Sequence, residues 1–213
     1  STISFKEPTR LGSVIATTGR ADRFGLSSYQ TQLDFYPHIR PGMYANINVG
    51  YSHDANLYPR YRVGVDLFQS LGHGFEVSGG YRHLGFTNSV DIYTFSVSKY
   101  YHSFLFTGRG YLVPGSTGLS GTGAVSARYF LGSEGTHDYI EVGYHYGASP
   151  TVVQTITNIS VLSSNKWLAT YDKTIHHRFG FQINGSAGRV QQTISAVPHL
   201  WQFEVGLSLY YRF

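Results

Sequence analysis

The chain has 213 residues, of which 25 are Gly and none is Cys; only 13% are charged, while 16% are aromatic. This composition excludes a disordered chain, which has few aromatics and high net charge, and a helical bundle, which is rich in Ala, Glu, Lys and Leu. The formal charge of +4, without a cluster of basic residues, argues against a nucleic-acid partner, and the lack of Cys excludes disulfides and thiolate metal sites.

The chain contains no run of eighteen apolar residues, so we expect no transmembrane helix. It opens Ser-Thr-Ile-Ser-Phe, without the basic and apolar regions of a signal peptide. A processed chain, or the C-terminal part of a longer one, is expected to open in this way.

Apolar and polar residues alternate with a period of two along the chain, and this pattern predicts strands with one apolar and one polar face. The apolar sides of five such stretches, in chain order, are Ala45, Ile47, Val49 and Tyr51; Val63, Val65 and Leu67; Phe75, Val77 and Tyr81; Tyr93, Phe95 and Val97; and Ile140, Val142, Tyr144 and Tyr146. The strongest case is the last stretch, in which every second residue is apolar: Phe203, Val205, Leu207, Leu209, Tyr211 and Phe213.

Turn-like stretches between these segments, including Pro37 to Gly42, divide the chain into twelve predicted strands. Their ranges are 11–23, 27–36, 43–52, 61–71, 75–86, 90–100, 103–113, 118–130, 138–148, 164–175, 177–190 and 200–213. Residues 1–7 and 151–161 are further candidates, so fourteen strands is the alternative. No segment has a helical period, and the fold class is all-β.

The polar faces favour a barrel that is inside out relative to a soluble one. A soluble sandwich or barrel needs a charged outer coat, whereas these faces carry few Lys and much Gly, Ser, Thr, Asn and Gln. Alternating segments of about ten residues, separated by turns, are typical of a transmembrane β-barrel with a polar lumen. We therefore expect residues 1–213 to form one closed antiparallel barrel with short turns. The expected aromatic girdles are Tyr36, Tyr58, Tyr61, Tyr100, Tyr101, Tyr129, Tyr139 and Trp201.

Charged residues on the polar faces are the candidates for the lumen: Arg62, Asp66, Glu76, Arg82, Arg109, Arg128, Glu141, Glu204 and Arg212. Arg62 and Asp66 share one face of one strand, and Glu76 and Arg82 share a face of the next, so we expect cross-strand ion pairs. Such pairs have two interpretations. They neutralise one another and fill the bore, or they guide a polar or anionic solute.

The last strand resembles the C-terminal recognition signal of bacterial outer-membrane proteins, with Leu209, Tyr211 and the final Phe213 as its apolar positions. This resemblance implies insertion into the bilayer by the barrel-assembly machinery. It implies the outer membrane of a Gram-negative bacterium as the location, and no activity.

A more specific similarity lies upstream. It rests on the runs DFYPHIRPGMY at 34–44, NVGYS at 48–52, LYPRYRVGVDL at 57–67 and GFEVSGGYR at 74–82, together with IYT at 92–94 and KY at 99–100. In these runs the chain resembles the YaiO family of outer-membrane β-barrels over about residues 10–130, and the similarity is thin between 149 and 200. The family usually has Glu where Asp66 stands. The resemblance implies a barrel found alone or after a periplasmic repeat domain, often in exopolysaccharide contexts, with no established activity.

Enzymatic chemistry is not expected. His102-Ser103 is an adjacent His–Ser pair, but neighbours on a strand point to opposite faces. His53-Asp54 lacks a second acidic pair nearby, and His176-His177 fits a hairpin tip. His137, Asp138 and His145 give only a weak metal hypothesis. We expect no cofactor and no metal.

Two functions therefore lead. The first is a non-enzymatic narrow pore or export conduit for polar solutes or glycans. The second is a plugged structural or docking barrel that anchors a periplasmic domain or partner. A lipid-modifying enzyme of the outer membrane ranks third.

Overall fold

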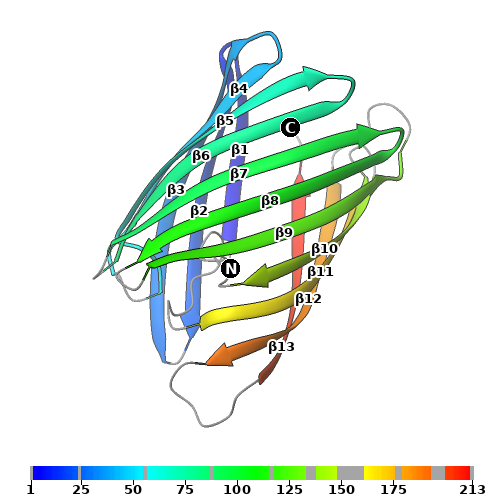
Figure 1. The fold of residues 1–213 in the computed structure, drawn as a ribbon. Coiled ribbons are helices and arrows are strands. Elements are labelled where there is room, and N and C mark those ends of the chain that lie inside the picture. Colours follow the sequence, from blue (N-terminus) through cyan, green and yellow to red (C-terminus); the bar gives the residue numbers. More distant parts are fainter. Residues whose placement is uncertain are drawn as a thin grey trace. The chain divides into compact units, whose positions relative to one another are not determined.

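The structure is a computed structural model, and it describes residues 2–23, 25–54, 57–86, 89–115, 118–132, 138–147, 161–175, 179–192 and 200–211. These residues form thirteen strands, hydrogen-bonded side by side in chain order from β1 to β13 (Figure 1). The strands are β1 Thr2–Thr9, β2 Gly12–Arg23, β3 Leu26–Arg40, β4 Met43–Ser52, β5 Tyr61–Gly72, β6 Phe75–Gly85, β7 Ser89–Tyr101, β8 Phe104–Gly115, β9 Gly118–Phe130, β10 Tyr139–Gly147, β11 Val161–Ile175, β12 Phe179–Gln192 and β13 Leu200–Tyr211. No helix of the described residues is long and apolar enough to cross a membrane.

The all-β prediction is confirmed, and each of the twelve predicted segments corresponds to a strand. The thirteenth strand is β1, which pairs with β2 from Thr2↔Gly19 to Thr9↔Gly12. The proposed extra strand at 151–161 lies, except for Val161, outside the described residues. Closure of the sheet, and with it a count of twelve or fourteen, stays a prediction.

The predicted end of β3 is wrong. Pro37 to Gly42 reads as a turn, but β3 continues to Arg40 and only Pro41-Gly42 turns the chain. The pairing of β3 with β4 shifts between His38 and Arg40, and such an irregularity accommodates an extra residue and a nearby Pro inside a strand. Gly42 has φ of 75°, a conformation that favours glycine and lets two residues reverse the chain.

The strands belong to two compact units. The first contains the described residues up to Ser96, together with Gly110–Gly121. The second contains Val97–Arg109 and the described residues from Thr122 onward, so the boundary runs across β7, β8 and β9. Each unit has its own polar and apolar face, and each is described by itself below.

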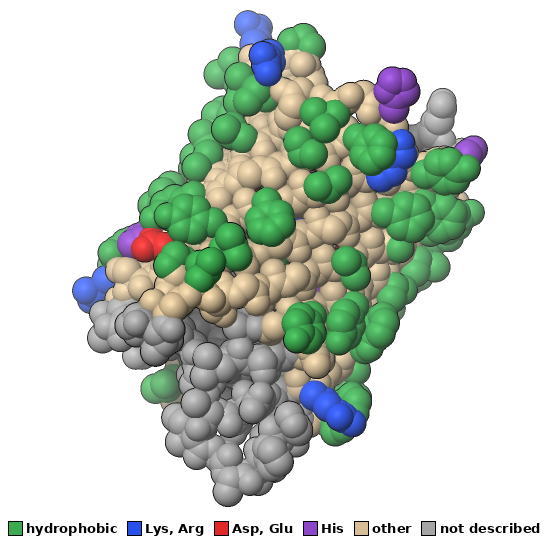
Figure 2. Space-filling view, in the orientation of Figure 1, with side chains coloured by type: hydrophobic (Ala, Val, Ile, Leu, Met, Phe, Trp, Pro, Cys, Tyr) green, Lys and Arg blue, Asp and Glu red, His purple; other side chains and the backbone are tan. Residues whose placement is uncertain are grey.

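The apolar face is the exposed one. Along β5, Val63, Val65 and Leu67 are 41–52% exposed, whereas Arg62 and Asp66 between them are 7% and 5% exposed. On β13, the apolar side chains from Phe203 to Leu209 are 67–86% exposed. On the face shown in Figure 2, hydrophobic side chains spread over the strands and charged side chains lie toward the margins. This arrangement is the reverse of that in a soluble protein, as the inside-out interpretation of the alternation predicts.

The girdle prediction is partly wrong. Tyr61, Tyr100, Tyr101, Tyr129 and Trp201 are exposed, as expected of interfacial aromatics. Tyr58 is buried in the connection between β4 and β5. Tyr139 takes a hydrogen bond from Gln182 at 2.9 Å on the polar face, and Tyr36 is half-buried on the polar side of β3. A tyrosine near a strand end can lie on the apolar or on the polar face. Only its position, odd or even relative to the apolar residues of the same strand, decides which face it joins.

Candidate functional site: the polar face

The centre of the polar face in the first unit is an ion pair between β5 and β6. Arg82 Nη2 lies 2.9 Å from Asp66 Oδ2, and Thr94 on β7 donates a hydrogen bond to Asp66 Oδ1 at 2.5 Å. Both charged side chains are largely buried. The predicted cross-strand pairing is confirmed for Asp66 and Arg82. Because the carboxylate is bonded at both oxygens, its charge is neutralised within the sheet.

The described contacts of Arg62 do not include a cross-strand ion pair with Glu76. Its Nη1 donates to Gln32 Oε1 on β3 at 3.0 Å and not to Glu76. The reason is the register of β5 and β6, which sets Leu84 opposite Arg62 and Ser70 opposite Glu76. The two residues lie near opposite ends of the β5–β6 pair, so no ion pair forms between them.

Gln32, the partner of Arg62, also contacts a second acidic residue, Asp34. Gln32 Nε2 donates to Asp34 Oδ2 at 2.6 Å, and Asn48 on β4 donates to Asp34 Oδ1 at 2.7 Å. Asn46 reaches the same oxygen at 3.4 Å. Asp34 is therefore neutralised by amide donors and by the nearby guanidinium of Arg62. Side chains that are hydrogen-bonded across strands in this way favour one register of β3, β4 and β5.

An apolar cluster covers the polar face toward the ends of β6 and β8 and the start of β7. Leu84, Ile92 and Tyr111 are buried there, with Phe86, Val90 and Val113 packed against them. Leu84 is the direct neighbour of Arg62 across β5 and β6. The face therefore changes along the strands from an apolar layer to a charged, hydrogen-bonded layer.

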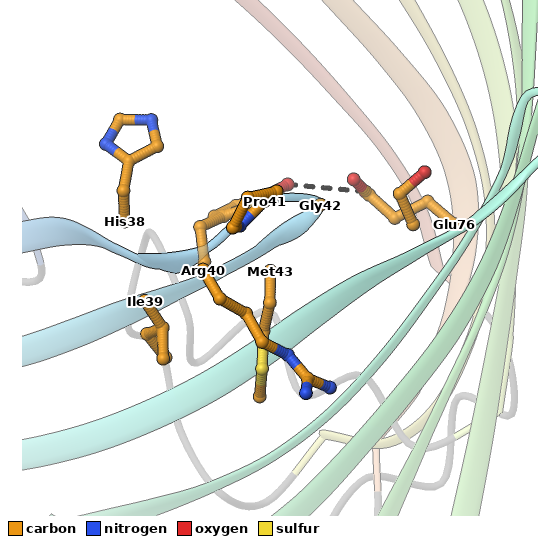
Figure 3. Close-up of a pocket in the computed structure, with 9 residues that line it drawn as sticks. His38, Ile39, Arg40, Pro41, Gly42, Met43 and Glu76 are labelled. Atoms are coloured by element: carbon orange, nitrogen blue, oxygen red, sulfur yellow. Dashed lines mark hydrogen bonds between the residues drawn. The ribbon is translucent and has the colours of Figure 1, made fainter.

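Glu76 and a pocket lie at the other end of the strands. Tyr44 donates to Glu76 Oε1 at 3.3 Å, and the Tyr44 ring stacks on Phe68 at 4.5 Å between centroids. The pocket of about 520 Å³ is lined by the β3–β4 turn and by residues of β5 and β6: His38, Ile39, Arg40, Pro41, Gly42, Met43, Tyr44, Ser70 and Glu76. In Figure 3, Glu76 reaches from β6 toward the turn, while His38 points away from Arg40 and Met43. Arg40 Nη2 donates to Gln69 Oε1 at 3.2 Å.

The second unit holds further predicted residues. Arg128 and Glu141, direct neighbours on β9 and β10, form an ion pair at 2.5 Å, and the guanidinium lies 4.0 Å from the Tyr139 ring centroid. Glu204 on β13 pairs with Lys166 at 2.6 Å and accepts hydrogen bonds from Ser186 and Gln202. Arg109 is exposed, and no ion pair of it is present in the described part of the chain.

The C-terminal positions are only partly described. Leu209 is exposed on the apolar side of β13, as the assembly-signal hypothesis requires. Tyr211 is the last described residue of β13, and Arg212 and Phe213 lie outside the described residues. The placement of Arg212 on the polar face therefore stays a prediction.

The weak metal hypothesis is wrong for the residues that can be placed. Asp138 precedes β10 and His145 lies near its other end, so seven residues, or about 23 Å of strand, separate them. Asp138 instead accepts hydrogen bonds from Lys173 Nζ at 2.7 Å and from the Thr174 backbone N–H at 2.8 Å. No group of three metal-ligating side chains occurs in the described ranges, and His137 and His176-His177 lie outside them.

Sequence reasoning missed two acids of the polar face. Asp34 receives three amide hydrogen bonds, and Asp172 accepts from Tyr210 at 2.8 Å and from Gln182 at 3.2 Å. Both stand in strands whose alternation is irregular, where apolar residues occupy polar-face positions. The sequence signal that identifies them is spacing, because residues an even number apart on a strand share a face. Asp34 is an even number of residues from Gln30 and Gln32, and Asp172 is an even number of residues from Lys166 and Thr170.

One comparison with known proteins gives a match. The model of the family described as the YaiO membrane beta barrel domain matches residues 1–152, which span the first ten strands. No curated protein and no solved structure matches the chain.

Proposed function

Because this chain belongs to the family of YaiO membrane beta barrel domains, we propose that it is an integral barrel of the bacterial outer membrane that serves as a structural or docking barrel and passes little solute. The exposed apolar face of β13 and its apolar C-terminal positions support this location. The role is non-enzymatic, and no cofactor takes part.

The hydrogen-bonded network on the first unit's polar face carries this proposal. Arg62 and Asp66 are buried, the Arg82 side chain is 16% exposed, and each is bonded to other side chains of the sheet. A solute could reach these charges only after the Asp66–Arg82 pair and the Arg62–Gln32 bond were broken, which leaves buried charges uncompensated. The adjacent apolar layer around Leu84 and Ile92 adds a stretch that water wets poorly.

The pocket at the β3–β4 turn is the place where we propose that a periplasmic partner docks. Barrels of this kind have short periplasmic turns and longer extracellular loops. Pro41-Gly42 and His73-Gly74 are two-residue turns at the pocket's end of the first unit, whereas the opposite end carries the longer connection 53–60. Ile39 is exposed beside the pocket, so an apolar contact is open to a partner.

Conductance of the refolded protein in a planar bilayer tests the structural role. We expect insertion without steady conductance for the natural sequence. The double variant Asp66→Asn with Arg82→Ser removes both charges of the pair and should raise conductance. The matched control Val125→Ala lies on the exposed apolar face and should stay silent. Steady, ion-selective current through the natural sequence would contradict the proposal.

A narrow conduit for polar solutes or glycans is the second candidate, and the second unit favours it. Arg109 and Ser208 are exposed on positions of its polar face, so they are open to a solute. If the conduit exists, Arg109→Ala should lower the preference for anions over cations in the same bilayer recording.

A further inference from the structure

The apolar face of the second unit has one row of polar and aromatic side chains that crosses four strands. The pairing registers place Tyr146 of β10 beside Asn165 of β11, Asn165 beside Arg189 of β12, and Arg189 beside Trp201 of β13. All four side chains are exposed. We call this set the Arg189 row.

The rows that follow along the strands carry no charge. They are Tyr144, Trp167, Ala187 and Phe203; Val142, Ala169, Gly185 and Val205; and Ile140, Tyr171, Ile183 and Leu207. The next charged side chain on this face of β11 is Lys173, eight residues from Asn165. Eight residues span about 26 Å of strand, or about 20 Å across a membrane at a tilt near 40°. This length approaches the apolar band of about 25 Å seen in such barrels, so the Arg189 row stands at head-group depth.

Among the described residues, no carboxylate pairs with Arg189 on this lipid-facing surface. Its guanidinium lies 5.0 Å from the Trp201 ring centroid, and within the described ranges no ion pair of Arg189 occurs. A guanidinium that lies over an aromatic ring and has no carboxylate partner keeps the N–H groups at its edge available. These N–H groups match the oxygens of a phosphate.

The end of the barrel at which the row lies points to one leaflet. The β12–β13 connection at residues 193–199 and the β10–β11 connection at 148–160 both leave from the end where Arg189 and Tyr146 stand. At the opposite end, the β11–β12 connection is residues 176–178 and the β9–β10 connection is residues 131–138, so the longest connection of the unit, 148–160, lies at the end of the Arg189 row. Longer connections face the outside of the cell in barrels of this class.

We propose that the Arg189 row binds the phosphate of a glycolipid of the lipid A type in the outer leaflet. Arg189 supplies the positive charge, the Asn165 amide and the Tyr146 hydroxyl supply hydrogen bonds, and Trp201 holds the guanidinium and packs on the sugar. The lipid's acyl chains lie against the uncharged rows below.

Native mass spectrometry of the refolded full chain in detergent, with added diphosphoryl lipid A, tests this site. Arg189→Gln should weaken binding about tenfold, since a charge-assisted contact to phosphate is lost. Arg189→Lys should retain most of the affinity. The matched control is Arg20→Gln on β2: Arg20 also lies over a ring, that of Tyr29 at 5.5 Å, but Asp22 neutralises it at 2.9 Å, so little change is expected.

Three results would overturn the proposal. The first is equal binding of diphosphoryl lipid A to the natural sequence and to Arg189→Gln, with both folded by circular dichroism. The second is that Arg189→Gln weakens the binding of dephosphorylated lipid A, or of phosphatidylglycerol, as much as it weakens the binding of diphosphoryl lipid A. The site would then not select the phosphate of an outer-leaflet glycolipid. The third is a change in oligomeric state without a change in bound lipid, which would identify the row as a contact between two copies.

Discussion

Gly80 of β6 leaves open the space that the carboxylate of Asp66 on β5 occupies. The two residues are direct neighbours in the β5–β6 register. A Cβ on Gly80 would lie 2.6 Å from the Val65 carbonyl oxygen, and closer still to Asp66 Oδ1. The Asp66–Arg82 pair therefore depends on a missing side chain across the strand.

Gly80→Ala should destabilise the barrel by about 1–3 kcal/mol, the usual cost of overpacking, because backbone as well as a carboxylate must move. Its sequence neighbour provides the control. A Cβ on Gly79 meets nothing within 4 Å, so Gly79→Ala should be neutral or stabilise slightly through the unfolded chain. Urea unfolding of both variants in lipid vesicles makes the comparison, and equal stabilities would contradict the close contact.

Arg82→Ala should lower the free energy of unfolding by about 3–5 kcal/mol, because it leaves the buried Asp66 carboxylate unpaired. Arg128→Ala is the matched control, since Arg128 and Glu141 form a pair of similar length but are about a third exposed. It should cost about 1 kcal/mol or less. Adding Asp66→Asn to Arg82→Ala should recover part of the loss in the same urea titration, and no recovery would mean that Arg82 acts through packing.

Val205→Arg and Leu207→Arg should impair folding into bilayers, because a cation at mid-membrane on the lipid side costs about 2–4 kcal/mol. Val205 is 86% exposed on the apolar face. Ser208→Arg should fold better, since Ser208 lies on the other face, opposite Gln182. Folding yield into vesicles ranks the three variants. The reverse order would mean that the apolar face is the interior.

Asp138 should make stability depend on pH. Burial alone would raise the pKa of this carboxyl, but hydrogen bonds from Lys173 and Thr174 outweigh it and hold the pKa below its ordinary value of 3.8. A lowered pKa stabilises the folded state fully above 3.8, and this stabilisation is lost as the pH falls through the folded-state pKa. Asp138→Asn should therefore be less stable than the natural sequence at pH 7, and the difference should vanish toward pH 2. A difference independent of pH would indicate lost packing.

The sequence predicts the faces of the strands better than their partners. Along 61–67 of β5 and along β13 from Trp201, every second residue is apolar, so parity alone assigns Val63, Arg62 and Val205 to their faces. Which residues meet across strands depends on register, and register is set by turn lengths and by shifts such as the one after His38. Asp66 and Arg82 are on adjacent strands joined by a two-residue turn, so a pair between these strands could be anticipated, whereas Arg62 and Gln32 are on strands separated by β4 and their bond could not.

The alternation along β5 also bears on assembly. Because side chains alternate with a period of two, a slip of one residue against β4 and β6 exchanges the two faces completely. Arg62 and Asp66 would then enter hydrocarbon, while Val63 and Val65 would replace them among the polar side chains of β3 and β6. A strand paired in the wrong register therefore costs free energy on the lipid face and on the polar face at the same time. Such a strand can dissociate from the growing barrel before the next strand pairs.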